Sequence, residues 1–263
     1  MTTLTHAVGD SATMVARQLR HMVRYPSMTL LLAGMPIFFL LLFVYVFGGA
    51  MDFGANGAAA GRAAYLDYVA PGIMLIAVAS AAQGTAISVA MDMTEGIVAR
   101  FRTMDIARVS VLTGHVVGSL VQAMVSVALV TAVALLIGFR PGAGPAEWPA
   151  IVGLMALVSF ALTWLSVALG LVSTTVETAS NLPMPLVFLP FLGSGFVPTE
   201  TLPAGLRWFA EYQPFTPITE TLRGLLMGTE IGDSATAAVA WCAGIALVSY
   251  LWARRLYNRD PAA

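Results

Sequence analysis

The sequence predicts an all-α membrane protein, and two observations lead to this fold class. Six long stretches carry no Asp, Glu, Lys or Arg, and nearly every charged residue lies between them. Each stretch is about 20 residues or longer, so a helix rising ~1.5 Å per residue would cross ~30 Å of hydrocarbon. Only 10% of the residues are charged, compared with about 25% in soluble domains, and the mean hydropathy is +0.82. The predicted spans lie within residues 25–51, 68–91, 109–139, 148–176, 178–199 and 234–253.

The six spans and their loops account for the 263 residues, so we expect residues 1–263 to form a single membrane domain. The net charge of −1 gives no indication of nucleic-acid binding, and all 13 basic residues are Arg. The one cysteine, Cys242, lies in the last predicted span, which excludes a disulfide within the chain. These features favour a protein whose partners are membrane lipid and other proteins.

Before the first predicted span, residues 11–26 show the pattern of an amphipathic helix. Apolar residues recur at helical spacing on one face, whereas Arg17, Arg20 and Arg24 lie on the other face. We expect this helix to lie on the inner leaflet, with its arginines at the lipid phosphates. It would serve either as a membrane anchor or as a surface next to a partner subunit.

The segment between the second and third predicted spans suits contact with another protein. Ile97, Phe101 and Met104 recur at i, i+4 and i+7, which places them on one face of a short helix. Charged residues of both signs flank this apolar ridge, and such a helix fits a groove on a partner. A solvated charged loop is the alternative. The charged residues are Asp92, Glu95, Arg100, Arg102, Asp105 and Arg108.

Few polar residues lie within the predicted spans. Gln83 lies near the middle of the second span, and Asn181 lies in the fifth. Either residue would form hydrogen bonds between helices or line a translocation path. His115 lies near the start of the third span, and we expect it to have a structural or interfacial role. The predicted spans carry no charge, whereas ion-coupled transporters usually place one near the membrane midplane.

The fifth predicted span and the segment after it are irregular. Prolines interrupt this span, and each interior proline removes a backbone hydrogen bond and bends a helix. Residues 199–228 are too polar to span a membrane, and further prolines divide them into helix-like pieces. We expect two short helices in or dipping into the outer interface; an ordinary outer loop is the alternative. The aromatic residues expected at headgroup depth are Trp208, Phe209, Tyr212 and Phe215.

The distribution of arginine predicts the orientation of the chain. Nine of the 13 arginines lie in the N-terminal segment, in residues 92–108 and at the C-terminus, which share one side if there are six spans. The positive-inside rule places that side in the cytoplasm. We therefore expect a multi-pass protein of the plasma membrane with a cytoplasmic N-terminus and a cytoplasmic C-terminus.

Three segments resemble elements of one transporter family. Residues 95–104, EGIVARFRTM, resemble the Glu/Arg-Gly-x-x-x-Arg-x-Arg-x-Met signature of ABC-2 type permeases, in particular the daunorubicin-resistance branch. Residues 194–228 are similar to that family's Phe-Val-Pro, Leu-Pro, Gln-Pro-x-Thr-Pro and Arg-Gly-Leu-Leu elements, in the same order. Residues 68–72, YVAPG, are the third match. Asp105 departs from the pattern, because the family usually has proline after the methionine.

This resemblance implies a fold and a function. ABC-2 permeases have six transmembrane helices, an N-terminal amphipathic interfacial helix and a broken outer re-entrant hairpin before the last helix. Two permease chains, identical or related, pair to form the translocation path, and each docks a cytoplasmic ABC ATPase subunit. Residues 92–108 would be the coupling helix in a groove of that ATPase. The coupling residues implied are Asp92, Glu95, Gly96, Arg100, Phe101, Arg102, Met104, Asp105 and Arg108.

The chain lacks the lysine of a Walker A loop and the motifs of two classes of membrane-embedded protease. A Walker A loop requires Lys, and the sequence has none, so we expect ATP and Mg²⁺ on the partner ATPase and no cofactor or metal on this chain. No H-E-x-x-H motif is present, and a serine protease of the rhomboid kind would need a histidine after His115.

The resemblance implies an exporter of amphipathic drug-like or lipid-like solutes. Export of a polysaccharide or another glycan, a membrane-embedded enzyme and a passive channel or scaffold are the alternatives.

Overall fold

The computed structural model describes residues 24, 26–48, 58–94 and 108–257, and this part of the chain contains helices and turns but no β-strand. The all-α prediction is confirmed. The elements in chain order are α2 (Pro26–Leu42), the π-helix η1 (Phe43–Phe47), α3 (Ala58–Thr94), α5 (Arg108–Leu136), α6 (Glu147–Val172), α7 (Val176–Asn181), α8 (Met184–Phe188), the 3₁₀ helices η2 (Leu189–Leu192) and η3 (Thr199–Thr201), α9 (Ala204–Tyr212), α10 (Phe215–Met227) and α11 (Ser234–Tyr257).

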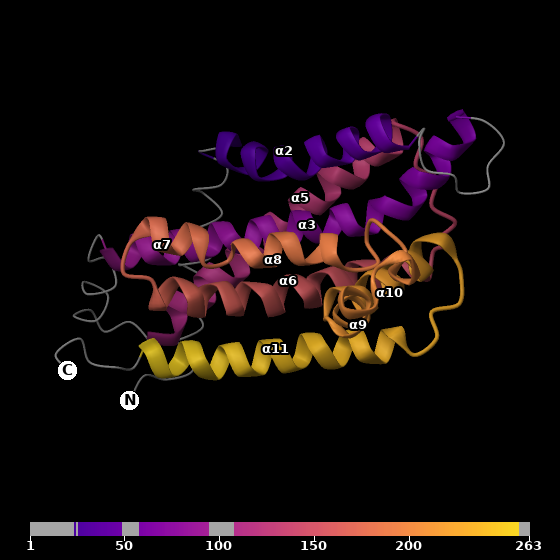
Figure 1. Ribbon diagram of the computed structural model, residues 1–263. Coiled ribbons are helices and arrows are strands. Elements are labelled where there is room, and N and C mark those ends of the chain that lie inside the picture. The colour runs from indigo at the N-terminus through magenta and orange to yellow at the C-terminus, as the bar shows by residue number, and fades with distance from the viewer. Residues whose placement is uncertain (1–23, 25, 49–57, 95–107, 258–263) are drawn as a thin grey trace.

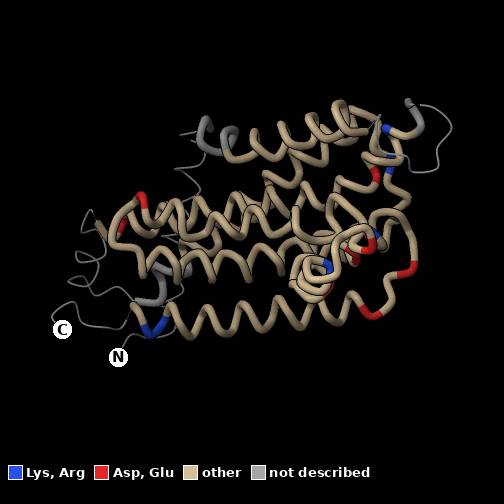
Figure 2. The backbone as a smooth tube through the Cα atoms, in the orientation of Figure 1, with Lys and Arg blue, Asp and Glu red and all other residues tan. Residues whose placement is uncertain are grey.

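Four helices of the described part are long and apolar enough to cross a membrane, namely α3, α5, α6 and α11. Residues 32–47, which belong to α2 and η1, form a shorter apolar helix. Figure 2 shows the described charged residues gathered towards the two ends of the bundle, with an uncharged middle. This distribution is typical of a protein whose middle lies in hydrocarbon.

The second span begins earlier than the charge-free stretch at 68–91 predicts. α3 begins at Ala58 and so includes two charged residues before that stretch. Arg62 is exposed, and the Asp67 carboxylate accepts a hydrogen bond from the backbone N–H of Arg140. Both charges therefore have polar surroundings near one end of the helix, which explains why they do not interrupt it.

The fifth stretch, residues 178–199, does not form one continuous helix. It is divided among α7, α8 and η2, with Pro183 immediately before α8 and Pro190 within η2. Proline lacks the N–H group that a helix interior needs, so each of these residues limits the helix around it. The expectation of a single bent span is thus replaced by a row of short helices.

α3 lies at the centre of the bundle (Figure 1). It packs against α2, α5, α6, α7, α8 and α10. In its most apolar window 78% of the residues are buried, compared with 17% for α11, which packs mainly on α6. A movement of α3 would therefore displace most of the other described helices.

The bundle has two distinct ends. At one end, here named the loop end, α3 finishes at Thr94, α5 begins at Arg108 and α11 finishes at Tyr257. At the opposite end, named the hairpin end, α9 and α10 lie near the starts of α3 and α11 (Figure 1). α3 runs from the hairpin end to the loop end.

Glycine permits close backbone contacts near both ends of α3. A Cβ atom added to Gly170 of α6 would lie 2.7 Å from the Ala86 carbonyl oxygen and 3.0 Å from the Val89 Cβ. A Cβ atom added to Gly72 of α3 would lie 2.9 Å from the carbonyl oxygen of Gly195. Small residues let backbones approach in this way in membrane proteins. Larger side chains at Gly170 or Gly72 would force the packed segments apart.

Many serine and threonine hydroxyls in the described helices bond to their own helix. Eight of them donate to the carbonyl oxygen four residues earlier. Such a bond satisfies the hydroxyl at membrane depth without a neighbouring helix. The donors are Thr85, Ser88, Thr94, Thr131, Ser173, Ser180, Thr219 and Thr221.

Candidate functional site at the two ends of α3

The predicted coupling segment joins α3 to α5 at the loop end. Only its flanks are described: Asp92 lies near the end of α3, and Arg108 is the first residue of α5. Of the predicted interfacial arginines, Arg24 is described and exposed, whereas Arg17 and Arg20 lie outside the described residues. The coupling residues that also lie outside them are Glu95, Gly96, Arg100, Phe101, Arg102, Met104 and Asp105.

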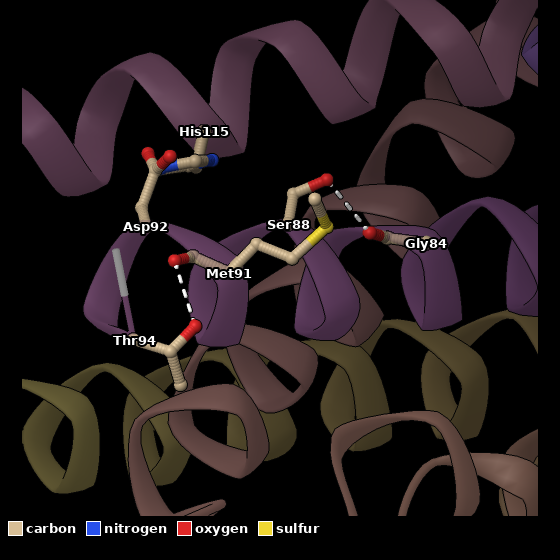
Figure 3. A network of polar contacts seen from close by, with 6 residues as sticks. All are labelled: Gly84, Ser88, Met91, Asp92, Thr94 and His115. Atoms are coloured by element: carbon tan, nitrogen blue, oxygen red, sulfur yellow. Dashed lines mark hydrogen bonds and ion pairs between the residues drawn. The ribbon is translucent and has the colours of Figure 1, made fainter. Parts of the chain in front are cut away.

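Asp92 and His115 join the two helices that flank this segment (Figure 3). The Oδ2 atom of Asp92 lies 3.0 Å from Nε2 of His115, and the two side chains are only 13% and 7% exposed. Further into the bundle, the hydroxyls of Thr85 and Ser119 share a hydrogen bond. Two polar contacts therefore tie α3 to α5 next to the segment that connects them.

Hydroxyl groups hold the last turns of α3 in helical geometry (Figure 3). The Thr94 hydroxyl lies 3.0 Å from the carbonyl oxygens of both Ala90 and Met91, to which it donates. Nearly two turns earlier, Ser88 donates to the Gly84 carbonyl oxygen, also at 3.0 Å. α3 therefore reaches the start of the coupling segment as a regular helix.

An apolar cluster at the loop end brings α3, α5, α6 and α11 together. Within it, the rings of Trp164 and Tyr250 meet edge to face, with centroids 5.0 Å apart. Apolar surroundings strengthen a polar contact and make a lone buried partner costly. The Asp92–His115 pair therefore adds a specific polar contact to an end of the bundle that is otherwise held by apolar contacts. The buried members of the cluster are Val89, Val116, Trp164, Val167, Ala168, Ala253 and Tyr257.

Sequence analysis did not connect His115 with Asp92. It gave His115 a structural or interfacial role and assigned Asp92 to the ATPase contact. In the structure the Asp92 side chain is turned towards α5, so one role of this carboxylate is to pair with His115. The signal that could have suggested the pair is position, because both residues lie within about two turns of the helix ends that residues 95–107 join.

Gln83 connects α3 to the first of the short helices. Its amide nitrogen donates to the Ser180 carbonyl oxygen at a distance of 2.7 Å. Gln83 is partly buried, whereas Asn181, the last residue of α7, is exposed. An interhelical hydrogen bond was one of the two roles predicted for these residues. The other role, contact with a transported solute, stays a prediction for both.

At the hairpin end, Arg223 joins three segments of the chain. Its Nη2 atom donates to the carbonyl oxygens of Tyr68 at 3.2 Å and Ser194 at 2.5 Å. The guanidinium carbon lies 4.1 Å from the centre of the Tyr68 ring, in cation–π geometry. Burial lowers the pKa of the guanidinium from its usual value, although Arg remains charged in proteins. A partly buried cation thus links α3, α10 and the turn after η2.

Two of the three segments that resemble family elements meet at this point. The contact of Arg223 with Tyr68 and the approach of Gly72 to Gly195 both join residues 68–72 to residues 194–228. Sequence analysis noted both segments but gave Arg223 no role. The contact joins residues 155 positions apart, and no local pattern indicates such a pairing.

α9 and α10 are two short helices in the region where sequence analysis expected them. Trp208 is 66% exposed, Tyr212 is 64% exposed and Phe209 is 40% exposed, which is compatible with an interfacial position. Phe215 is only 2% exposed and packs within the main apolar core. Its ring therefore packs inside the protein and does not face the headgroups, because this residue begins α10 on the face that is buried.

Two cavities lie towards the hairpin end. The first has a volume of about 280 Å³ and an almost wholly apolar wall, to which α5 and α6 contribute most residues, with Met74 of α3 also present. The second has a volume of about 390 Å³ and lies between α9, α10 and the start of α11. Its wall combines the carboxylates of Glu220 and Asp233 with the ring of Trp241. The first cavity suits an apolar group and the second a polar one.

The apolar spans and the buried polar ties define a multi-pass helical membrane protein. The chain belongs to the ABC-2 type transporter family, whose sequence profile matches residues 11–227. The family resemblance drawn from three short segments is thereby confirmed.

The similar proteins include permeases of drug resistance. The chain is 29% identical to the daunorubicin resistance ABC transporter permease protein DrrB1 of Streptomyces coeruleorubidus, over 97% of this chain and 88% of that protein. It is 26% identical to the probable doxorubicin resistance ABC transporter permease protein DrrC of Mycobacterium tuberculosis, over 67% of this chain and 65% of that protein. A 26% match to ABC transporter G family member 20 of Dictyostelium discoideum covers 71% of this chain and 25% of that protein.

Proposed function

We propose that this chain is the permease subunit of an ATP-driven exporter, coupled to a separate cytoplasmic ABC ATPase. The family membership over residues 11–227 is the observation that carries this proposal. In this proposal, the chain dimerises with an identical or related permease, and the two form the translocation path. ATP and Mg²⁺ bind to the partner ATPase, since the chain has no Lys for a Walker A loop.

The proposed membrane arrangement has six transmembrane segments. α2 with η1 forms the first, α3, α5, α6 and α11 form four others, and the short helices α7, α8 and η2 together form the fifth. α9 and α10 form the broken outer hairpin, and the predicted helix that carries Arg17, Arg20 and Arg24 lies on the inner leaflet. The loop end is then cytoplasmic and the hairpin end faces outwards.

In the proposed cycle, residues 95–107 sit in a groove of the ATPase. Binding of ATP shifts an equilibrium only if it favours one of the two states, so the ATPase must hold the segment differently in the inward-facing and outward-facing states. The two flanks of the segment cannot move independently, because Asp92 on α3 pairs with His115 on α5. Movement of the segment is thus passed to both helices together.

The proposed cargo is an amphipathic drug-like or lipid-like solute. The names of two relatives refer to resistance against daunorubicin and doxorubicin, and the apolar cavity of about 280 Å³ indicates that the membrane region offers room for an apolar group. A solute of this kind partitions into the membrane, and its apolar part would need few polar contacts along its path.

ATP-dependent export is tested by coexpressing the chain with a candidate ABC ATPase subunit from the same genome. We expect the two to copurify, and inverted membrane vesicles to accumulate a fluorescent anthracycline with ATP but not with a non-hydrolysable analogue. Vesicles with an ATPase that lacks its Walker A lysine are the control. Copurification without ATP-dependent accumulation of an anthracycline or a fluorescent lipid would reject the proposed cargo class, and failure to copurify would reject the exporter itself.

The orientation is tested by cysteine labelling. On a Cys242→Ser background, Arg62→Cys and Glu200→Cys should react with a membrane-impermeant maleimide added outside intact cells, because both positions are exposed near the hairpin end. Arg255→Cys, exposed near the end of α11, should react only after the cells are opened. Protection of both outer positions in intact cells would contradict the six-segment arrangement.

A further inference from the structure

We infer that Arg223 is a positioning residue of transport, which fastens the α9–α10 hairpin to α3 so that the hairpin follows this helix. The inference rests on the proposed function. In this role, Arg223 helps to transmit movement of α3 from the loop end to the hairpin end. Arg223 need not touch the solute for this role, because it acts through the segments that it joins.

The first argument is the number of segments that one side chain holds. The Nη2 atom of Arg223 donates to a carbonyl oxygen of α3, at Tyr68, and to one in the turn after η2, at Ser194. The guanidinium plane also meets the Tyr68 ring. A guanidinium presents several donors in a fixed plane, so it fixes the relative position of its acceptors in a way that an ammonium group does not. The three segments are therefore held in one geometry.

The second argument is the backbone packing beside this contact. Gly72 lies one turn after Tyr68, and Gly195 follows Ser194 directly; the backbones of the two glycines are in close contact. The Gly195 carbonyl oxygen would lie only 2.9 Å from a Cβ atom on Gly72, so no side chain separates the two segments. Arg223 thus acts where the turn already rests on α3, and a small shift of α3 would press directly on that turn.

The third argument is the continuity of α3 between its two ends. The helix continues from Ala58 to Thr94, and its one proline, Pro71, lies three residues after Tyr68, so the residues between Pro71 and Asp92 contain no further proline. Tyr68 and Asp92 are 24 residues apart in this helix, which corresponds to about 36 Å along its axis. Rigid helices that end in specific contacts are suitable carriers of coupling between distant sites. Asp92 receives the movement at one end and Tyr68 delivers it at the other.

The fourth argument is the chemistry of the contact. Within the described part of the chain, the salt bridges are Asp92–His115 and Arg207–Glu211, so Arg223 is held by carbonyl oxygens and the Tyr68 side chain, with Glu220 adding a longer-range electrostatic attraction. Its Nε atom is buried without a hydrogen-bond partner. The geometry therefore depends on the shape of the guanidinium, and a change of side chain at constant charge should disturb it.

The test measures solute transported per ATP hydrolysed in the reconstituted permease–ATPase complex. We expect Arg223→Gln to lower this ratio about fivefold or more, because fivefold is the lower limit of typical coupling between two sites. Binding of the ATPase and basal ATP hydrolysis should be unchanged. Arg223→Lys keeps the charge but not the planar donors, and should give an intermediate ratio. Tyr68→Leu, which removes the ring and keeps the carbonyl, should also lower it.

Arg207→Gln is the matched control. Arg207 lies on α9 in the same hairpin, is exposed, and pairs with Glu211 four residues later at 2.7 Å. Loss of this surface pair should leave the ratio unchanged.

An unchanged ratio in Arg223→Gln and Tyr68→Leu would overturn the inference. The inference would also be overturned if, in every variant, transport fell only in proportion to the amount of folded protein. A purely structural contact would give that result. If Arg223→Gln does not fold, the Arg223→Lys and Tyr68→Leu ratios decide in the same way. Absence of ATP-dependent transport in the unmodified complex would instead count against the proposed function, so the two failures are distinguishable.

Discussion

Reversal of charge at Glu95 or Arg102 is expected to release the ATPase subunit while the permease remains folded and inserted. In the proposed complex these residues lie in a partly desolvated groove, where like charges facing each other cost several kcal/mol. A loss of that size corresponds to a more than tenfold weaker complex. Copurification of the ATPase with Glu95→Arg or Arg102→Glu permease measures the effect, together with solute-stimulated ATP hydrolysis.

Two comparisons make this result specific to the coupling segment. Arg255→Glu changes a charge at the loop end but outside the segment, and it should leave the ATPase bound. A reversed charge in the facing groove of the ATPase should restore part of the binding to the Glu95 or Arg102 variant. Full ATPase association and full export by both variants would show that residues 95–107 are only a solvated connector.

Loss of either partner of the Asp92–His115 pair is expected to destabilise the permease by about 1–3 kcal/mol, because the permease loses a buried polar contact between α3 and α5. The 3.0 Å contact and the low exposure of both side chains support this size of effect. Asp92→Leu and His115→Leu each remove one partner, and the double variant removes both. The cost of the double variant should be smaller than the sum of the single costs, since each single variant already removes the same contact. Thermal unfolding of the purified permease measures all three.

Ser88→Ala is the control for this cycle. Ser88 lies one turn before Asp92, but its hydroxyl donates to Gly84 in its own helix, so its removal should change stability by less than about 0.5 kcal/mol. Strictly additive costs for the two Leu variants would mean that Asp92 and His115 do not act as a pair. The same variants also report on coupling, because α3 and α5 would lose a specific contact next to residues 95–107, the segment proposed to bind the ATPase.

The spans of this protein could be predicted from the sequence because charge is excluded from hydrocarbon. α5, α6 and α11 lie close to the charge-free stretches that predict them. α3 starts earlier than its stretch, since Arg62 and Asp67 lie near a helix end where polar partners are available. The positions of charged residues thus predict which residues lie in the membrane interior, but they do not predict the residue at which a helix begins.

The candidate site was predictable only in part, because its contacts join different helices. Residues 92–108 showed their amphipathic pattern locally, although most of them lie outside the described residues. The pairing of Asp92 with His115 depends on how α3 and α5 pack, and that of Arg223 with Tyr68 depends on the path of the whole chain between them. The burial of Phe215 was not predicted for a related reason: an aromatic residue in a polar segment suggests exposure at an interface, but its helix turns that face inwards.

The self-bonded hydroxyls of the helices have a consequence for motion. A hydroxyl that donates to its own helix is satisfied in every position of that helix, so two helices can slide past each other without breaking such a bond. By contrast, cross-helix polar bonds connect α3 to α5, to α7 and to α10. The contact between α6 and α11 includes the edge-to-face pair of Trp164 and Tyr250. The start of α11 belongs to the tied set as well, because Ser234 donates a hydrogen bond to Glu220 of α10. The segments tied to α3, together with that end of α11, can therefore move as one body.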